Sequence, residues 1–179
     1  MNKFKSTWHL NNSVCELQPS KLEDDRGFFS EVFQNDEFKN LGIEDKFIQD
    51  NQSLSENKFT FRGLHFQKPP FEQAKLVRVL RGSILDIAVD LRKNSATYLE
   101  HISIELSEHK FNQLYIPIGF AHGFLTLEKN CEILYKVSNP YNHQSDISLN
   151  VFDQKLKIDL GYAKDKIILS EKDKKLNYI

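Results

Sequence analysis

The segment 60–67 reads TFRGLHFQ and places a cation and a titratable imidazole among apolar residues. Arg62 and His65 stand there between Phe and Leu side chains that are typical of a buried strand. Burying either polar group is costly unless it has a partner or a task. His65 is therefore a candidate for catalysis, because the unperturbed pKa of histidine, about 6.5, suits proton transfer near neutral pH. A structural histidine is the alternative that this segment alone leaves open.

A second arginine could act together with Arg62 on a phosphate group. Arg26 lies beside Gly27 in the stretch DDRGFFSEVF, residues 24–33. Two guanidinium groups can grip a diphosphate through planar, bidentate contacts. Spacing alone equally allows two unrelated surface ion pairs.

A transition-metal site is not expected. Such a site needs three or four ligands from His, Asp, Glu or Cys, and a strand often supplies them as His-x-His. Both His65 and His122 are flanked by glycine and aromatic residues, but position 67, two residues after His65, is a glutamine. The Gln67 amide is a poor ligand for a transition metal, so no metal is predicted.

Strand periodicity separates the two polar residues of the first segment. Side chains alternate between the faces of a strand, which puts His65 with Gly63 and Gln67 and puts Arg62 on the opposite face. If both side chains meet one ligand, something must break the alternation, and Gly63 could allow a bulge or a tight approach of two strands. Otherwise Arg62 serves a different site, for example at a subunit interface.

Three further segments carry polar side chains that could face the same ligand. Tyr135 shares a strand face with two aliphatic residues and is expected to point inward, where a packed tyrosine is the alternative to a catalytic one. Lys75 opens the apolar run KLVRVL, although strand lysines also protect sheet edges. Gln49 and Asn51 lie on one face of FIQDNQS.

Composition limits the class of protein. The 179 residues are enough for one sizeable domain, and we assign residues 1–179 to a single domain because no linker or repeat divides them. The 24 Lys and Arg against 25 Asp and Glu argue against nucleic-acid binding. Cys15 and Cys131 have no metal-ligand spacing and fit a reducing compartment. No apolar run is long enough for a membrane span, so the protein is expected to be cytoplasmic.

The middle of the chain predicts many short strands. HISIEL (101–106) alternates cleanly between apolar and polar residues, and a Gly-Ser turn signal between KLVRVLRG (75–82) and SILDIAVDLR (83–92) predicts a hairpin. A short helix is predicted at 35–42, with Asp36 near its start and Gly42 at its end, and another short helix or turn at 170–176, capped by Ser170. Closely spaced strands predict a sandwich or a barrel.

Taken in order, these segments resemble the dTDP-4-dehydrorhamnose 3,5-epimerase family, nucleotide-sugar epimerases of the metal-free cupin kind. The resemblance covers most of the chain and is carried by DDRGFFSEVF, FIQDNQS, FRGLHFQ, KLVRVLRGSILDIAVDLR, LYIPIGFAHGF, EILYKVSNPY and ILSEKD. It implies an all-β fold, an antiparallel jelly-roll (cupin) barrel with a few short flanking helices. It also implies a homodimer with its active site in the mouth of the barrel.

The same resemblance assigns roles to individual residues. His65 matches the general base, Tyr135 the general acid, and Asp173 the carboxylate that orients the base. Lys75 matches the lysine near the keto oxygen of the substrate. The matched substrate-binding residues are Arg26 and Arg62 on the diphosphate, Gln49, Asn51 and His122 in the pocket, and Tyr141 near the nucleotide base.

The implied function is inversion of C3 and C5 in a nucleotide-linked 4-keto-6-deoxy sugar through an enolate. No cofactor is expected, because the reaction needs no redox step and the chain has no Gly-rich dinucleotide loop. The expected partner is the nucleotide-sugar substrate. Two alternatives stay open: an epimerase that inverts only C3 or only C5, and a non-catalytic sugar-binding cupin. A metal-dependent cupin oxygenase is disfavoured by Gln67.

Overall fold

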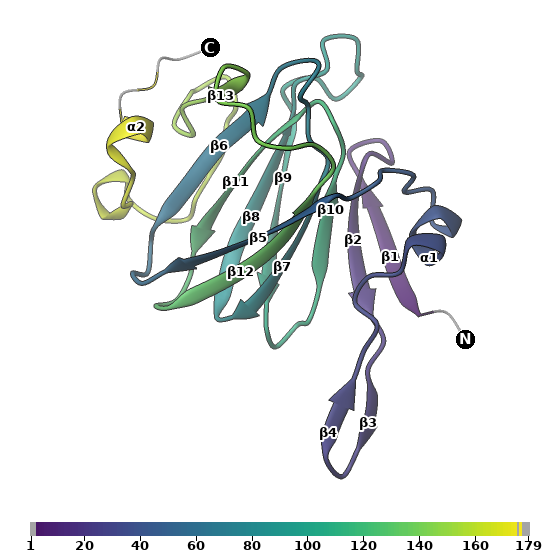
Figure 1. The fold of residues 1–179 in the computed structure, drawn as a ribbon. Coiled ribbons are helices and arrows are strands. Elements are labelled where there is room, and N and C mark those ends of the chain that lie inside the picture. Colours follow the sequence, from purple (N-terminus) through teal and green to yellow (C-terminus); the bar gives the residue numbers. More distant parts are fainter. Residues whose placement is uncertain (1–2, 175, 177–179) are drawn as a thin grey trace.

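Two antiparallel β-sheets pack face to face in the computed structural model (Figure 1), which describes residues 3–174 and 176. In that part of the chain one sheet has six strands, in the spatial order β1 (Phe4–His9), β2 (Val14–Pro19), β10 (Gln113–Ile116), β7 (Lys75–Arg81), β12 (Cys131–Val137) and β5 (Gln49–Ser55). The other described sheet has five strands, in the order β13 (Asp146–Ser148), β6 (Phe61–Gln67), β11 (Phe120–Thr126), β8 (Ser83–Asp90) and β9 (His101–Ser107). This is the all-β jelly-roll architecture that the sequence predicts.

The chain crosses between the sheets where the sequence predicted a hairpin. β7 lies between β10 and β12 in the six-stranded sheet, whereas β8 lies between β11 and β9 in the other sheet. The predicted hairpin is therefore wrong, and Gly82, with φ of +79°, sits at a corner between the sheets. A Gly-Ser pair indicates that the chain turns, but it does not indicate which sheet the next strand joins.

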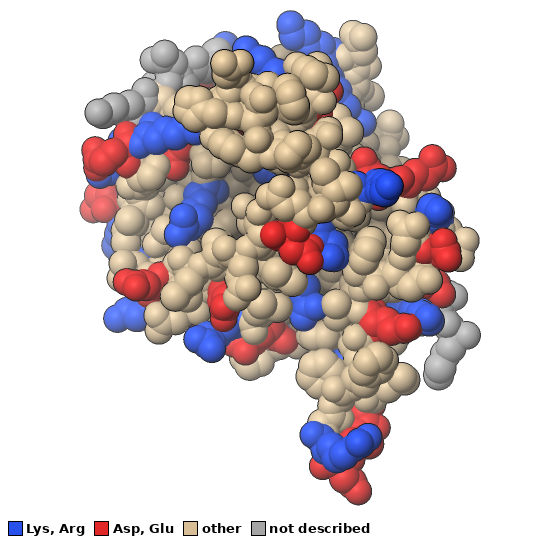
Figure 2. All heavy atoms as spheres, in the orientation of Figure 1, with Lys and Arg blue, Asp and Glu red and all other residues tan. Residues whose placement is uncertain are grey.

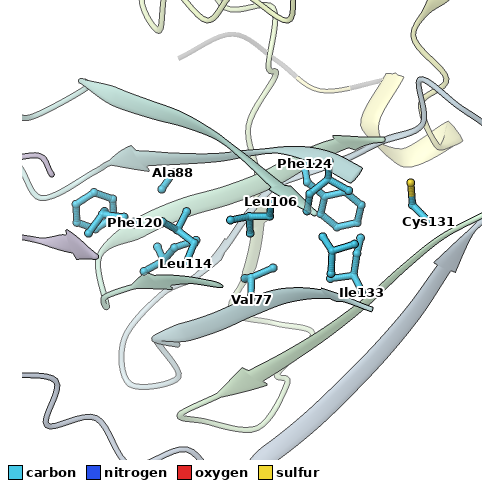
Figure 3. Packing of buried hydrophobic residues seen from close by; sticks show 12 residues of the cluster. Val77, Ala88, Leu106, Leu114, Phe120, Phe124, Cys131 and Ile133 are labelled. Atoms are coloured by element: carbon cyan, nitrogen blue, oxygen red, sulfur yellow. The ribbon is translucent and has the colours of Figure 1, made fainter. Parts of the chain in front are cut away.

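The hydrophobic core fills the space between the two sheets. Figure 3 shows Val77 and Ile133 of the six-stranded sheet facing Leu106 and Phe124 of the other sheet, and all four side chains are buried. The inward Ile102, Ile104 and Leu106 of β9 confirm the alternation predicted for that strand. Each fully buried aliphatic or aromatic side chain contributes about 1.5–3 kcal/mol to folding.

Short helices flank the sandwich. α1 (Asn35–Asn40) confirms the first predicted helix, and Asp36 lies in its first turn as predicted. Its N-cap is Gln34, whose side chain accepts from the Glu37 N–H. η1 (Lys164–Lys166) precedes α2 (Glu171–Lys174), where the Asp173 N–H donates to the Ser170 hydroxyl as a cap. Residue 175 of the second predicted segment lies outside the described residues. No helix in the described part is long and apolar enough to cross a membrane.

One hairpin projects from the body of the molecule. It consists of β3 (Leu22–Asp24) and β4 (Gly27–Phe29), and it extends away from the sandwich in Figure 1. Figure 2 shows charged side chains gathered at its tip. Three apolar side chains of this hairpin, Leu22, Phe28 and Phe29, are more than half exposed.

Candidate active site

A bulge in β6 places Arg62 and His65 on one cavity. Across the strand pair, His65 lies opposite His122 while Arg62 lies opposite Phe124, so three steps along β6 match only two along β11. The extra residue breaks the alternation, which is the outcome that the sequence required if both side chains were to meet one ligand. Both residues accordingly line the same cavity.

Gly63 is the residue that makes this bulge possible. Its φ is +119°, a value that side-chain-bearing residues rarely adopt, and a Cβ built there would lie 2.6 Å from the Gly123 Cα and from the His122 carbonyl oxygen. The backbones of β6 and β11 thus approach too closely for any side chain at position 63.

Two adjoining cavities open between the sheets and share three side chains. The first has a volume of about 480 Å³ and the second about 380 Å³. His65, Lys75 and Tyr135 line both of them. The other polar side chains of the first cavity are Ser53, Thr60, Arg62, His122, Ser170 and Asp173. Those of the second are Gln49, Asn51, Gln67, Gln73, Tyr141 and Asp146.

Asp173 orients the His65 ring. Its Oδ1 lies 3.1 Å from His65 Nε2, and the Ser170 hydroxyl donates to its Oδ2 at 2.8 Å. Burial acts to raise the pKa of Asp173, but the hydrogen bonds from His65 and Ser170 outweigh it and lower that pKa. An ionised carboxylate only accepts, so Nε2 is the ring nitrogen that donates to Asp173.

Tyr135 and Lys75 stand on the opposite sheet from His65. Tyr135 packs against the core cluster, as its inward orientation predicted, and burial raises the pKa of its hydroxyl although Arg62 opposes the shift. The phenol therefore keeps its proton at neutral pH. Burial lowers the pKa of Lys75 to about 8 against the opposing effect of Asp86 and Asp146. Lys75 thus remains mainly an ammonium at pH 7.

His122 is held by a carboxylate that sequence reasoning missed. Both oxygens of Asp86 lie 3.0 Å from His122 Nε2, and the Asp86 side chain is fully buried. Burial lowers the pKa of His122 despite the opposing charge of Asp86, so the imidazole is neutral at pH 7. The available signal was an acidic residue within the otherwise apolar strand SILDIAVD.

The second cavity has polar walls. Gln49 Nε2 donates to Asn51 Oδ1 at 2.7 Å on one wall, and the Tyr141 hydroxyl donates to Asp146 Oδ2 at 3.2 Å on another. Lys172 also pairs with that Asp146 oxygen, at 2.7 Å. Sequence reasoning did not single out Asp146, which lies in the polar stretch after Tyr141.

Gln67 uses its amide to hold two loops beside this cavity. Its Nε2 donates to the carbonyl oxygens of Phe71 and Pro140, and its Oε1 accepts from the Asn142 N–H at 2.6 Å. These bonds fix the segment that carries Tyr141. Among the described residues no group of three or more His, Cys, Asp or Glu side chains is placed to hold a metal ion.

The structure brings all the predicted site residues to the two cavities except one. Arg26 lies at the tip of the projecting hairpin, where its side chain is 89% exposed and pairs with Asp24. It lines neither cavity of its own chain. Arg62, in contrast, reaches the first cavity while its guanidinium donates to Ser55 Oγ and to the Leu54 carbonyl oxygen.

Comparison with known proteins identifies the family. A family model described as dTDP-4-dehydrorhamnose 3,5-epimerase matches residues 10–179. The chain belongs to the dTDP-4-dehydrorhamnose 3,5-epimerase family. A relative with that name from Sinorhizobium fredii is 45% identical over 157 residues, which cover 88% of this chain and 80% of the relative. Members of this family are isomerases, and so is this protein.

Solved structures of epimerases share the whole architecture. The Bacillus anthracis dTDP-4-dehydrorhamnose 3,5-epimerase with TDP and PPi bound has a TM-score of 0.94 at 39% identity, over 98% of this chain and 99% of that one. The Legionella pneumophila dTDP-6-deoxy-D-glucose-3,5-epimerase in complex with dTDP-4-keto-L-rhamnose has a TM-score of 0.92 at 36% identity, over 98% and 92% of the two chains. The cupin-like fold predicted from sequence is thereby confirmed.

Proposed function

We propose that this epimerase inverts C3 and C5 of dTDP-4-dehydro-6-deoxyglucose to give dTDP-4-dehydrorhamnose. One observation carries the proposal: two groups suited to proton transfer stand on opposite walls of one site. His65 comes from β6 of the five-stranded sheet and Tyr135 from β12 of the six-stranded sheet, and both border the junction of the two cavities. A sugar ring held between the sheets would meet one group on each face.

Epimerisation needs this two-sided arrangement. The C3 and C5 hydrogens of a 4-keto sugar are acidic because both carbons are alpha to the carbonyl. His65 Nδ1 removes one of these protons, the electron pair moves onto the keto oxygen as an enolate, and Tyr135 returns a proton to the opposite face of that carbon. Asp173 stabilises the imidazolium that forms.

A cation must balance the charge of the enolate. Lys75 lines both cavities together with the two proposed proton-transfer groups, and its ammonium is the proposed donor to the keto oxygen. His122, whose Nε2 donates to Asp86, is the proposed acceptor, through Nδ1, for a hydroxyl of the sugar. These steps balance without an oxidant or reductant, so the proposal includes no cofactor.

The nucleotide and diphosphate are assigned to the cavity mouth. Arg62, Gln49 and Asn51 are the proposed diphosphate contacts, and Tyr141 the proposed neighbour of the base. The named ligands of the Bacillus and Legionella structures, TDP and a dTDP-sugar, support a thymidine nucleotide.

Arg26 fits the proposal only if two copies of the chain associate. The hairpin carries it away from its own cavities and exposes Phe28 and Phe29, which would be buried by a second subunit. We therefore propose a homodimer in which Arg26 contacts the diphosphate bound to the partner. Residues 1–179 form one domain in this proposal, and the free thiols of Cys15 and Cys131 agree with a cytoplasmic location.

Deuterium incorporation tests the function. The protein is incubated with dTDP-4-dehydro-6-deoxyglucose in deuterium oxide, and C3 and C5 are followed by NMR. We expect label and inverted configuration at both carbons. Label at only one carbon would replace the proposal by a monofunctional C3- or C5-epimerase. No label with a folded protein would leave a sugar-binding role.

A further inference from the structure

The inner face of β5 is polar along its whole length. Because facing residues of an antiparallel pair point to the same side, the pairing of β5 with β12 turns four alternate residues inward, opposite Val137, Tyr135, Ile133 and Cys131. These four are Gln49, Asn51, Ser53 and Ser55. The first two line the second cavity and Ser53 lines the first, so this strand borders both cavities.

Ser53 is the member of this row without a partner. Gln49 bonds to Asn51, and Ser55 accepts from Arg62 Nε at 3.0 Å. The Ser53 hydroxyl is buried and has no hydrogen bond to any residue in the part of the chain that the structure describes. A buried hydroxyl in that condition is unfavourable, and one that lines a cavity can be satisfied by a ligand.

The neighbouring cation indicates what kind of ligand atom approaches. The acceptors of the Arg62 guanidinium, Ser55 Oγ and the Leu54 carbonyl oxygen, are both neutral, and no carboxylate pairs with Arg62 within the described ranges. Its charge is thus left for an anion. Ser53 and Ser55 are successive inward residues, about 7 Å apart along the strand. A diphosphate, with oxygens on two adjacent phosphorus atoms, can span that separation.

We propose that the Ser53 hydroxyl donates a hydrogen bond to the diphosphate of the substrate beside Arg62. This inference rests on the proposed function, since it assumes a nucleoside diphosphate sugar as the ligand. Ser53 acts in binding and not in proton transfer. Its contact is to a part of the substrate that does not react, so its loss raises KM and leaves kcat nearly unchanged.

Ser53→Ala tests the proposal by titration with dTDP in a calorimeter. A hydrogen bond to a charged oxygen predicts about tenfold weaker binding of dTDP. The KM for the full substrate should rise by a similar factor. The melting temperature should not fall, because the removed hydroxyl has no partner in the protein.

Ser148→Ala is the matched control. The Ser148 hydroxyl is also buried without a hydrogen-bond partner among the described residues, but it lines neither cavity. This variant should bind dTDP as the wild type does. Equal loss of affinity in both variants would show a general effect of the substitution and overturn the proposal.

Two further outcomes would also overturn it. Unchanged dTDP affinity in Ser53→Ala rules out the diphosphate contact. Unchanged dTDP affinity with a raised KM for the full substrate would move the contact to the sugar. Failure of the proposed function itself is a separate result, because it appears as absent deuterium incorporation in the wild-type protein.

Discussion

Two polar clusters of this molecule differ in how fully their groups are paired. At the end of β8, the Asp90 carboxylate is fully buried and accepts hydrogen bonds from Arg92, Ser95 and Thr97. Burial acts to raise the pKa of Asp90, but these bonds outweigh it and hold that pKa well below its ordinary value. The Arg92 guanidinium also donates to Ser13 at 2.9 Å, which ties the cluster to the loop before β2.

The polar groups that line the cavities between the sheets are, by contrast, incompletely paired among the described residues. Arg62 pairs with no carboxylate in the described residues, the Ser53 hydroxyl has no partner there, and Lys75 keeps a lowered pKa because burial exceeds the effect of nearby acids. Unpaired polar groups of this kind reduce stability, whereas the saturated Asp90 cluster adds to it. The contrast supports the proposals that the first cluster stabilises the fold and that the second binds substrate.

The largest effect is expected at His65, the proposed general base among the cavity residues. His65→Asn should lower kcat about 1,000-fold, since a general base contributes about 10²–10⁴ in rate. The Ser170 hydroxyl still donates to Asp173 in this variant, so the loss of the one bond from His65 should change the free energy of unfolding by only about 1 kcal/mol. Deuterium exchange at C3 and C5 and thermal denaturation measure the two quantities. Exchange near the wild-type rate would remove His65 from the role of base.

A smaller effect, on stability and not on the catalytic rate, is expected in the Asp90 cluster. Asp90→Ala leaves the Arg92 guanidinium and two hydroxyls without their shared acceptor and should cost about 3 kcal/mol of stability. The activity per folded molecule should stay near the wild-type value. Urea denaturation and kinetics on the folded fraction test this, and a loss of kcat without a loss of stability would contradict the division between the clusters.

The smallest expected effect is a fall of kcat/KM at alkaline pH as Lys75 loses its proton. Its pKa is lowered to about 8, so the ammonium loses its proton as the pH rises through 8 and kcat/KM should fall about tenfold per unit above that value. Lys75→Arg keeps a permanent charge and should move this alkaline limb upward, even if its rate is lower. Values of kcat/KM from pH 6 to 10 for the wild type and for Lys75→Arg locate this alkaline limb. An unchanged limb in Lys75→Arg would assign it to another group.

Periodicity predicted those parts of the fold that depend on local pattern. The alternation in β9 and the inward Tyr135 follow from a period of two, and both are confirmed. Arg62 shows where this rule stops, because its face depends on a bulge that only the pairing with β11 reveals. Gly63 marked the position, but a glycine alone does not state which irregularity it permits.

Contacts between segments that lie far apart in the chain could not be predicted from the sequence. The predicted hairpin at Gly82 failed because neighbouring strands entered different sheets. Arg26 was grouped with Arg62 by residue type, yet the fold separates them. The carboxylates of Asp86 and Asp146 become visible as site residues only when β8 and β13 are placed beside their partner strands. The role of each site residue stays a prediction until the variants are measured.

The location of His65 and Tyr135 on separate sheets has a consequence for remote mutations. Packed sheets stand about 10 Å apart, and the volume of the side chains between them sets that separation. The gap between the proposed base and the proposed acid is therefore determined by core residues such as Val77 and Ile133, which bear no reactive group. Substitutions that thicken or thin this layer should change the ratio of C3 to C5 exchange, so product selectivity in this fold is also a property of its packing.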